Sequence, residues 1–286
     1  MGKTKIAWCD FSFNGWVGCT KVGPGCDHCY AESWAKRIGQ PGLWEGERRR
    51  TSESNWRQPL QWAGEAKRLE VRYRVFSASL ADVFDNEVPD EWRRDLFDLI
   101  RATPNLDWLI LTKRIGNAMK MLPDDWGRGW PNVWMGATMV NQEEVDRDLI
   151  KLLRVPAKVR WLSIEPQLGP IEPEDVCWVQ CVSTREEHDR DHDGGMWCDE
   201  RSVDWIVVGG ESGAHARPFA LEWARAMRDE CQKAGVAFFM KQMGTRWARD
   251  GGLTWRDQHA YRWNRDRAGA DPVEWPKDMR VREWPR

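Results

Sequence analysis

The chain has 286 residues, a formal net charge of −2, and 41% hydrophobic against 31% charged residues. This size suits one large domain or two small ones. No apolar run approaches the ~18 residues of a membrane helix and the N-terminus (MGKTKIAWCD) lacks a signal peptide's apolar core, so we expect a cytoplasmic protein without a membrane partner. The near-neutral charge excludes a global basic field for nucleic acid and leaves local patches open.

The N-terminal stretch GCTKVGPGCDHCY, residues 18–30, carries three cysteines with the spacing C-x6-C-x2-C. Glycine and proline leave the loop few backbone restrictions, so the thiols of Cys19, Cys26 and Cys29 can converge. Thiolates select zinc, copper(I) or iron–sulfur clusters. Three cysteines suit a [4Fe–4S] cluster with one open iron, which we favour; structural zinc with His28 or Cys9 as fourth ligand, and unligated thiols, are the alternatives.

Short apolar runs then alternate with amphipathic patterns along the chain. The predicted strands are residues 74–79, 108–112, 133–137, 159–164, 205–208 and 236–240. Most are continuous apolar runs, as in strands buried on both faces of a parallel sheet. Helices are predicted over residues 90–101, 142–153 and 221–233. The alternation predicts an α/β fold with parallel strands, a barrel or a partial barrel.

Residues 172–202 interrupt this alternation, with ten acidic against three basic side chains, and are expected to form an inserted loop or small subdomain. The insertion has the spacing C-x3-C-x6-H-x3-H-x5-C, formed by Cys177, Cys181, His188, His192 and Cys198. These side chains offer enough ligands for zinc. The alternative, which we weigh more heavily, is a hydrophilic surface loop without metal. Cys9 and Cys231 are expected to be buried small apolar residues.

Residues 241–286 form a basic, Trp-rich C-terminal extension, with eleven Lys or Arg against seven Asp or Glu and six Trp or Tyr. A charged surface with interspersed aromatic side chains is common, and we favour this interpretation. The alternative is a surface on which aromatic rings stack with bases while arginines contact phosphates.

The opening block TKIAWCDFSFNGWVGCTKVGPGCDHCYAESWAKR resembles that of a phage-associated protein family similar to radical SAM enzymes. Its relatives include spore photoproduct lyase, which repairs a thymine lesion in DNA. Later blocks resemble the same family: SASLADVFD (77–85), LTKRI (111–115), WMGATMVNQ (134–142), LSIEPQLGPI (162–171), DWIVVGGESG (204–213) and FFMKQMG (238–244).

The resemblance implies a partial (β/α)6-type radical SAM barrel over residues 1–240. It implies that Cys19, Cys26 and Cys29 ligate the [4Fe–4S] cluster and that the open iron chelates S-adenosylmethionine (SAM). An external one-electron reductant would then cleave SAM to a 5′-deoxyadenosyl radical. The commonest spacing in such enzymes is C-x3-C-x2-C with an aromatic residue before the third cysteine. Here the first gap is wider and His28 takes that place, where we expect it to cover the adenine.

Chemistry in a barrel of parallel strands gathers at the C-terminal strand ends. The candidate cofactor-binding residues are His28, Tyr30, Ser77, Ser79, Asp82 and Glu165, and the candidate substrate-binding residues are Lys113, Arg114, Glu211 and Lys241. An acid directly after a strand, as at Glu165 and Glu211, is costly to bury without a partner. Lys113 and Lys241 are candidate partners, so we weigh a structural ion pair evenly against a ligand contact.

These features predict a radical SAM enzyme that rearranges or modifies a nucleobase-derived substrate, in the context of phage DNA thymidine hypermodification. If phage-encoded, it would act in the host cytoplasm. An isomerase, a lyase and a transferase all stay open, as do DNA and a free nucleotide as substrate. The alternatives are a lyase that repairs damaged thymine and a non-catalytic, zinc-stabilised nucleic-acid-binding protein.

Overall fold

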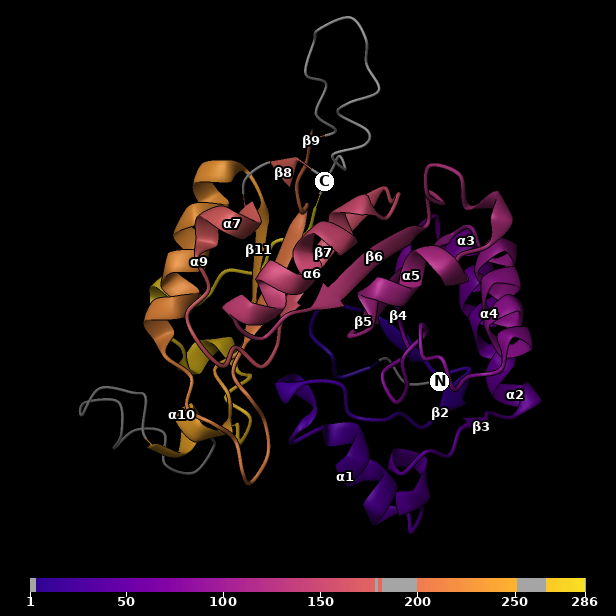
Figure 1. Cartoon of the computed structure of the whole chain (residues 1–286), viewed down its shortest axis with the longest axis horizontal. Helices are drawn as coiled ribbons and strands as arrows, with labels where there is room; N and C mark the ends of the chain where they lie inside the picture. Colours follow the sequence, from indigo (N-terminus) through magenta and orange to yellow (C-terminus); the bar gives the residue numbers. More distant parts are fainter. Residues whose placement is uncertain (1–3, 178–179, 182–199, 251–265, 286) are drawn as a thin grey trace, which may run out of the picture.

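The computed structural model of the chain describes residues 4–177, 180–181, 200–250 and 266–285. Seven strands form one sheet that curls into a half-barrel, and every neighbouring pair is parallel (Figure 1). In spatial order they are β1 (Phe11–Phe13), β4 (Tyr73–Ser77), β5 (Leu106–Thr112), β6 (Val133–Thr138), β7 (Val159–Ile164), β10 (Trp205–Gly209) and β11 (Ala237–Gln242). The predicted partial α/β barrel is therefore confirmed.

Helices from the strand connections cover the outer face of the sheet. They are α3 (Gln58–Leu69), α4 (Asp90–Ala102), α5 (Ile115–Met121), α6 (Gln142–Arg154), α7 (Pro173–Cys177) and α9 (Leu221–Ala234). Helix α4 shows how the amphipathic sequence pattern predicts a helix. Leu96 and Ile100 are fully buried, acids occupy its first turn, and a base lies in its last turn. Within the described residues, no helix combines the length and apolar character that crossing a membrane requires.

The remaining elements are short. Helix α1 (Tyr30–Arg37) follows the cysteine loop, α2 (Glu53–Trp56) precedes α3, and α10 (Thr245–Asp250) follows β11. Two antiparallel pairs stand apart from the main sheet: β2 (Trp16–Val17) with β3 (Arg49–Arg50), and β8 (Gln180–Cys181) with β9 (Glu200–Arg201). The second pair belongs to the acidic insertion.

Tryptophans fill the concave face of the half-barrel. Trp8, which precedes β1, contacts Trp161 of β7 at a centroid distance of 5.2 Å, and Trp161 lies 5.2 Å from Trp205 of β10. Gly136 of β6 is required for this packing, because a Cβ there would lie 2.3 Å from the Trp161 ring. The high tryptophan content of the chain therefore has a structural use: large rings pack the inside of the sheet.

The described part of the C-terminal region packs against the sheet. Arg282 forms a β-bridge with Phe239 of β11, and the Trp205 indole donates a hydrogen bond of 2.8 Å to the carbonyl of Glu283. Trp275 is buried and Trp284 packs on Phe239. These two rings therefore belong to the fold. Three further aromatic residues of this region, Trp255, Tyr261 and Trp263, lie outside the described residues.

Candidate cofactor and substrate site

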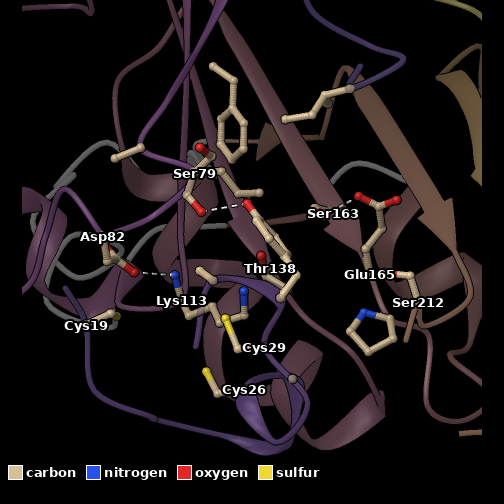
Figure 2. A pocket seen from close by; sticks show the side chains of 18 of the residues that line it. Cys19, Cys26, Cys29, Ser79, Asp82, Lys113, Thr138, Ser163, Glu165 and Ser212 are labelled. Carbon is tan, nitrogen blue, oxygen red and sulfur yellow. Dashed lines mark hydrogen bonds between the residues drawn. The ribbon is translucent and has the colours of Figure 1, made fainter. Parts of the chain in front are cut away.

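A cavity of about 390 Å³ lies at the C-terminal edge of the sheet, between the strand ends and the cysteine loop (Figure 2). Nearly all of the residues predicted to hold the cluster, the cofactor or the substrate line it: Cys19, Cys26, His28, Cys29, Tyr30, Ser79, Asp82, Lys113, Arg114, Glu165, Glu211 and Lys241. Ser77 does not line it and is fully buried in β4. Residues more than 200 positions apart in the sequence thus share one cavity.

The cysteine loop begins at a tightly constrained turn. Gly18 has φ +111°, and a Cβ at this position would lie 2.2 Å from the carbonyl oxygen of Glu47, so only glycine fits. The amide of Cys19 then donates to the carbonyl of Leu43 at 2.9 Å. Cys26 ends a short 3₁₀ turn, η1 (Pro24–Cys26), and Cys29 immediately precedes α1. Cys26 is buried, whereas Cys19 and Cys29 are half-buried.

Arg114 holds the Cys19 end of the loop. Its guanidinium donates to the Cys19 sulfur at 3.3 Å and to the carbonyl of Thr20 at 2.9 Å. It also lies 3.4 Å from a carboxylate oxygen of Asp82 and 3.8 Å from one of Asp85. Burial opposes the charge on Arg114, but Asp82 and Cys19 outweigh it and raise the pKa of the guanidinium above its ordinary value. Burial raises the pKa of the Cys19 thiol above its ordinary value, whereas the positive charge of Arg114 lowers it in part.

Two residues that the sequence did not single out, Arg48 and Asp85, complete this network. Arg48 approaches Asp85 to 2.6 Å, and both side chains are almost fully buried. Asp82, which was predicted, accepts hydrogen bonds from the Thr112 hydroxyl at 2.7 Å and the Lys113 amide at 2.9 Å. Asp82 therefore joins the ends of β4 and β5, and its described contacts are structural.

Glu211 and Arg217 hold the other end of the loop. The Arg217 guanidinium contacts Glu211 at 2.6 Å, Asp27 at 3.0 Å and the carbonyl of Pro24 at 3.0 Å. The Glu211 carboxylate also lies 3.0 Å from Nδ1 of His28. Burial alone would raise the pKa of Glu211, but the hydrogen bonds from Arg217 and His28 lower it below its ordinary value. The expected role of His28 over an adenine stays a prediction.

Glu165 and Lys241 form an ion pair in the cavity wall. Their closest atoms are 3.3 Å apart, and the Ser163 hydroxyl lies 3.4 Å from the same carboxylate oxygen. An ion pair is therefore present at both predicted acids: Lys241 pairs with Glu165 as expected, and an arginine rather than a lysine pairs with Glu211. Within the described chain, Oε1 of Glu165 and Oγ1 of Thr138 are buried without a hydrogen-bond partner. Such atoms in a cavity wall are suited to binding a ligand.

The arrangement of the three loop thiols around the cavity bears on which metal group they could hold. Tetrahedral zinc with Zn–S bonds of 2.3 Å would bring sulfurs to roughly 3.8 Å from one another. No three His, Cys, Asp or Glu side chains of the described residues are grouped to hold one metal ion. Figure 2 shows Cys26 beside Cys29, with Cys19 across from them beyond Lys113. Three thiols around one cavity match the chemistry of a cubane, whose irons are ligated separately by cysteines.

The two residues considered as a fourth zinc ligand, His28 and Cys9, are not placed beside the three loop thiols as free ligands. His28 contacts Glu211, and Cys9 does not line the cavity. Burial raises the pKa of the Cys9 thiol to about 12, so it disfavours the thiolate that a metal needs.

The acidic insertion is described only in part. Cys177 is buried under α9, with its sulfur 3.6 Å from that of Cys231 and 3.8 Å from that of Met227. The burial expected of Cys231 is thus confirmed. The side chain of Cys181, and all of His188, His192 and Cys198, lie outside the described residues, so zinc in the insertion stays a prediction.

Comparison with known proteins gives a family for the chain and three distant structural matches. No curated protein matches the chain. Among solved structures, a cysteine-to-serine mutant of spore photoproduct lyase matches with 12% identity and a TM-score of 0.49, over 83% of this chain and 78% of that one. The lyase complexed with dinucleoside spore photoproduct gives the same values. A mutant with bound AdoMet and the dinucleoside has 14% identity and a TM-score of 0.46, over 81% and 63%. The family model described as "Protein of unknown function (DUF5131)" matches residues 3–274, and the chain belongs to that family.

Proposed function

We propose that the chain is a radical SAM enzyme that holds a [4Fe–4S] cluster through Cys19, Cys26 and Cys29. The observation that carries the proposal is the meeting of these three thiols with polar side chains of several strand ends around one cavity of about 390 Å³. Active sites of parallel barrels lie at this edge of the sheet. When bound, the cluster would supply the electron that cleaves SAM to a 5′-deoxyadenosyl radical.

The protein's own residues would hold the ligands and exclude water. Arg114 orients Cys19, and the unpartnered oxygens of Glu165 and Thr138 offer hydrogen-bonding positions in the cavity wall. Trp8 and Phe76 line the same cavity and give it an apolar floor. An apolar floor matters for a reactive intermediate, because it keeps solvent and competing donors away.

For the substrate, we propose a nucleobase-derived molecule, in the context of phage DNA thymidine hypermodification. Lys5 and Lys113 line the cavity, and neither forms an ion pair with another described residue, which suits a ligand with phosphate groups. A base presented within DNA has to leave the stack first. Because Trp275 and Trp284 pack in the fold, base stacking by the C-terminal region would fall to its other aromatic residues.

The cluster is tested on anaerobically purified protein by iron and sulfide analysis and by formation of 5′-deoxyadenosine after reduction. We expect a brown protein that cleaves SAM, and loss of both properties in Cys19→Ala, Cys26→Ala and Cys29→Ala. Cys9→Ala is the matched control, because this cysteine lies outside the cavity lining, and it should keep its iron. Zinc without iron, or unchanged cleavage in the three loop variants, would contradict the proposal.

The substrate is tested with a deuterium-labelled thymine base, presented either in DNA or as a free nucleotide. Transfer of deuterium into 5′-deoxyadenosine from the DNA, with binding that weakens as salt is added, would support a DNA substrate. Replacing Arg262, Arg265 and Arg267 together by alanine should weaken that binding. The first two of these lie outside the described residues. Transfer only from the free nucleotide would overturn the DNA substrate and keep the enzyme class.

A further inference from the structure

We propose that Arg217 is the positioning residue for the Cys26–Cys29 end of the cysteine loop and acts both by direct contacts to the loop and through Glu211. The proposal that this positioning serves a cluster rests on the proposed function. That Arg217 holds the loop is argued from the contacts within the chain alone. Arg217 lies in the connection between β10 and α9, some 190 residues from the loop that it contacts.

Arg217 uses its donors on three separate acceptors at once. Two guanidinium nitrogens reach the two carboxylate oxygens of Glu211 at 2.6 and 3.0 Å, and its backbone amide donates to that carboxylate at 2.8 Å. The other contacts, both 3.0 Å long, go to the Asp27 carboxylate and the Pro24 carbonyl. A planar guanidinium provides this fork of donors, whereas a lysine ammonium has one point of charge.

The contacts fall on both sides of Cys26. Pro24 begins the 3₁₀ turn that ends at Cys26, and Asp27 follows that cysteine directly. Glu211 adds a contact to His28, the residue before Cys29. Three of the five residues from Pro24 to His28 are therefore in contact with Glu211 or Arg217, in the connection after β10. Only 6% of the Glu211 side chain is exposed, so its partners hold a largely buried carboxylate.

Loss of Arg217 leaves that carboxylate without its main counter-charge. An unpaired buried carboxylate is costly, and the local structure is expected to open to give it water. The opening would expose Cys26, which is buried in the intact loop. The Cys19 end has its own anchor in Arg114 and is expected to stay in place.

The test measures alkylation of individual cysteines by iodoacetamide in the metal-free full-length protein, with mass spectrometry as the readout. A loss of about 1 kcal/mol in local stability raises the alkylation rate of Cys26 about fivefold in Arg217→Ala. Alkylation of Cys19 should change by less than about twofold, since its anchor lies elsewhere. Arg217→Lys should restore little, because it cannot make the forked contacts.

Arg225→Ala is the matched control, because Arg225 lies within α9 and forms an exposed ion pair with Asp278, which is not part of the cysteine loop. This control should leave the Cys26 rate unchanged. Asp27→Ala, which removes one of the contacts and keeps the rest, should give an intermediate rate and guards against a variant that fails to fold. An unaltered Cys26 rate in Arg217→Ala, or equal increases at Cys19 and Cys26, would overturn the proposal.

A second readout uses the reconstituted protein. Iron release into a chelator should be about fivefold faster in Arg217→Ala than in the wild type, for the same local loss of about 1 kcal/mol. The electron paramagnetic resonance spectrum of the reduced cluster should change as well, because a ligand loop in a new position alters the iron environment. If the wild type binds no cluster, the proposed function fails, and the alkylation experiment still decides whether Arg217 positions the loop.

Discussion

The two ends of the cysteine loop are anchored by the same chemistry at different depths. At the Cys19 end, Arg114 and its acidic partners are more than nine-tenths buried. At the Cys26–Cys29 end, 26% of Arg217 is exposed, and more than half of its partner Asp27. Buried pairs are costly to break and exposed pairs contribute little. The comparison indicates a loop with one end fixed by the core and an adjustable Cys26–Cys29 end, which Arg217 and Glu211 hold in place less firmly.

The largest expected effect is at the buried end. Arg114→Ala removes a cation from between Asp82 and Asp85 and should lower the free energy of unfolding by about 3 kcal/mol. Arg217→Ala should cost about 1 kcal/mol, because Arg217 and Asp27 are partly exposed and the Glu211 carboxylate can gain water when the loop opens. Urea denaturation of both variants measures the difference. Equal losses in the free energy of unfolding would show that the two ends of the loop are anchored equally firmly.

Glycine substitutions give the next largest effect. Gly18→Ala, at a left-handed φ and against the Glu47 backbone, should cost about 2 kcal/mol and reduce cluster binding. Gly23 has extended backbone, and a Cβ there meets only the carboxylate tip of Glu144, which can move. Gly23→Ala should therefore cost about 0.5 kcal/mol, the size of an ordinary surface change. Thermal unfolding checks both, and a Gly23 variant as damaged as the Gly18 variant would count against an adjustable end.

The smallest effect concerns pH at the adjustable end. The pKa of Glu211 is lower in the folded chain than its ordinary value. Its contribution to stability is therefore present above the ordinary pKa of a glutamate and is lost as pH falls through the lower folded value. The stability difference between the wild type and Glu211→Gln should shrink on acidification. A difference that stays constant between pH 7 and pH 3 would rule out this linkage.

The sequence predicts the framework well because buried parallel strands are continuous apolar runs. All six predicted strands are present, and the helices over residues 90–101, 142–153 and 221–233 lie within one residue of α4, α6 and α9. Strand β1 was not predicted, because it has only three residues and a polar serine lies at its centre. Helices α1, α3 and α5 were not predicted either.

The site could be predicted where position along the chain determines position in space. The ends of parallel strands meet, so Asp82, Lys113, Glu165 and Lys241 were found from their place after a strand. Arg217 lies in the connection after β10, and two of its partners, Pro24 and Asp27, lie near the N-terminus, so no local pattern marks its role at the cysteine loop. Arg48 escaped for the same reason. Their roles depend on contacts between distant segments, which only the folded chain brings together.

The Trp8–Trp284 contact has a consequence for the connectivity of the fold. The Trp284 indole donates to the carbonyl of Trp8 at 3.4 Å, and the Arg74 guanidinium lies 4.5 Å from the centre of the Trp284 ring. Two segments 276 positions apart in the sequence thus meet beside the concave face. The contact joins the segment before β1 to the segment after β11, so each holds the other against the inside of the sheet. Trp284→Ala should therefore loosen the segment around Trp8 as well as its own, which hydrogen exchange of both segments would measure.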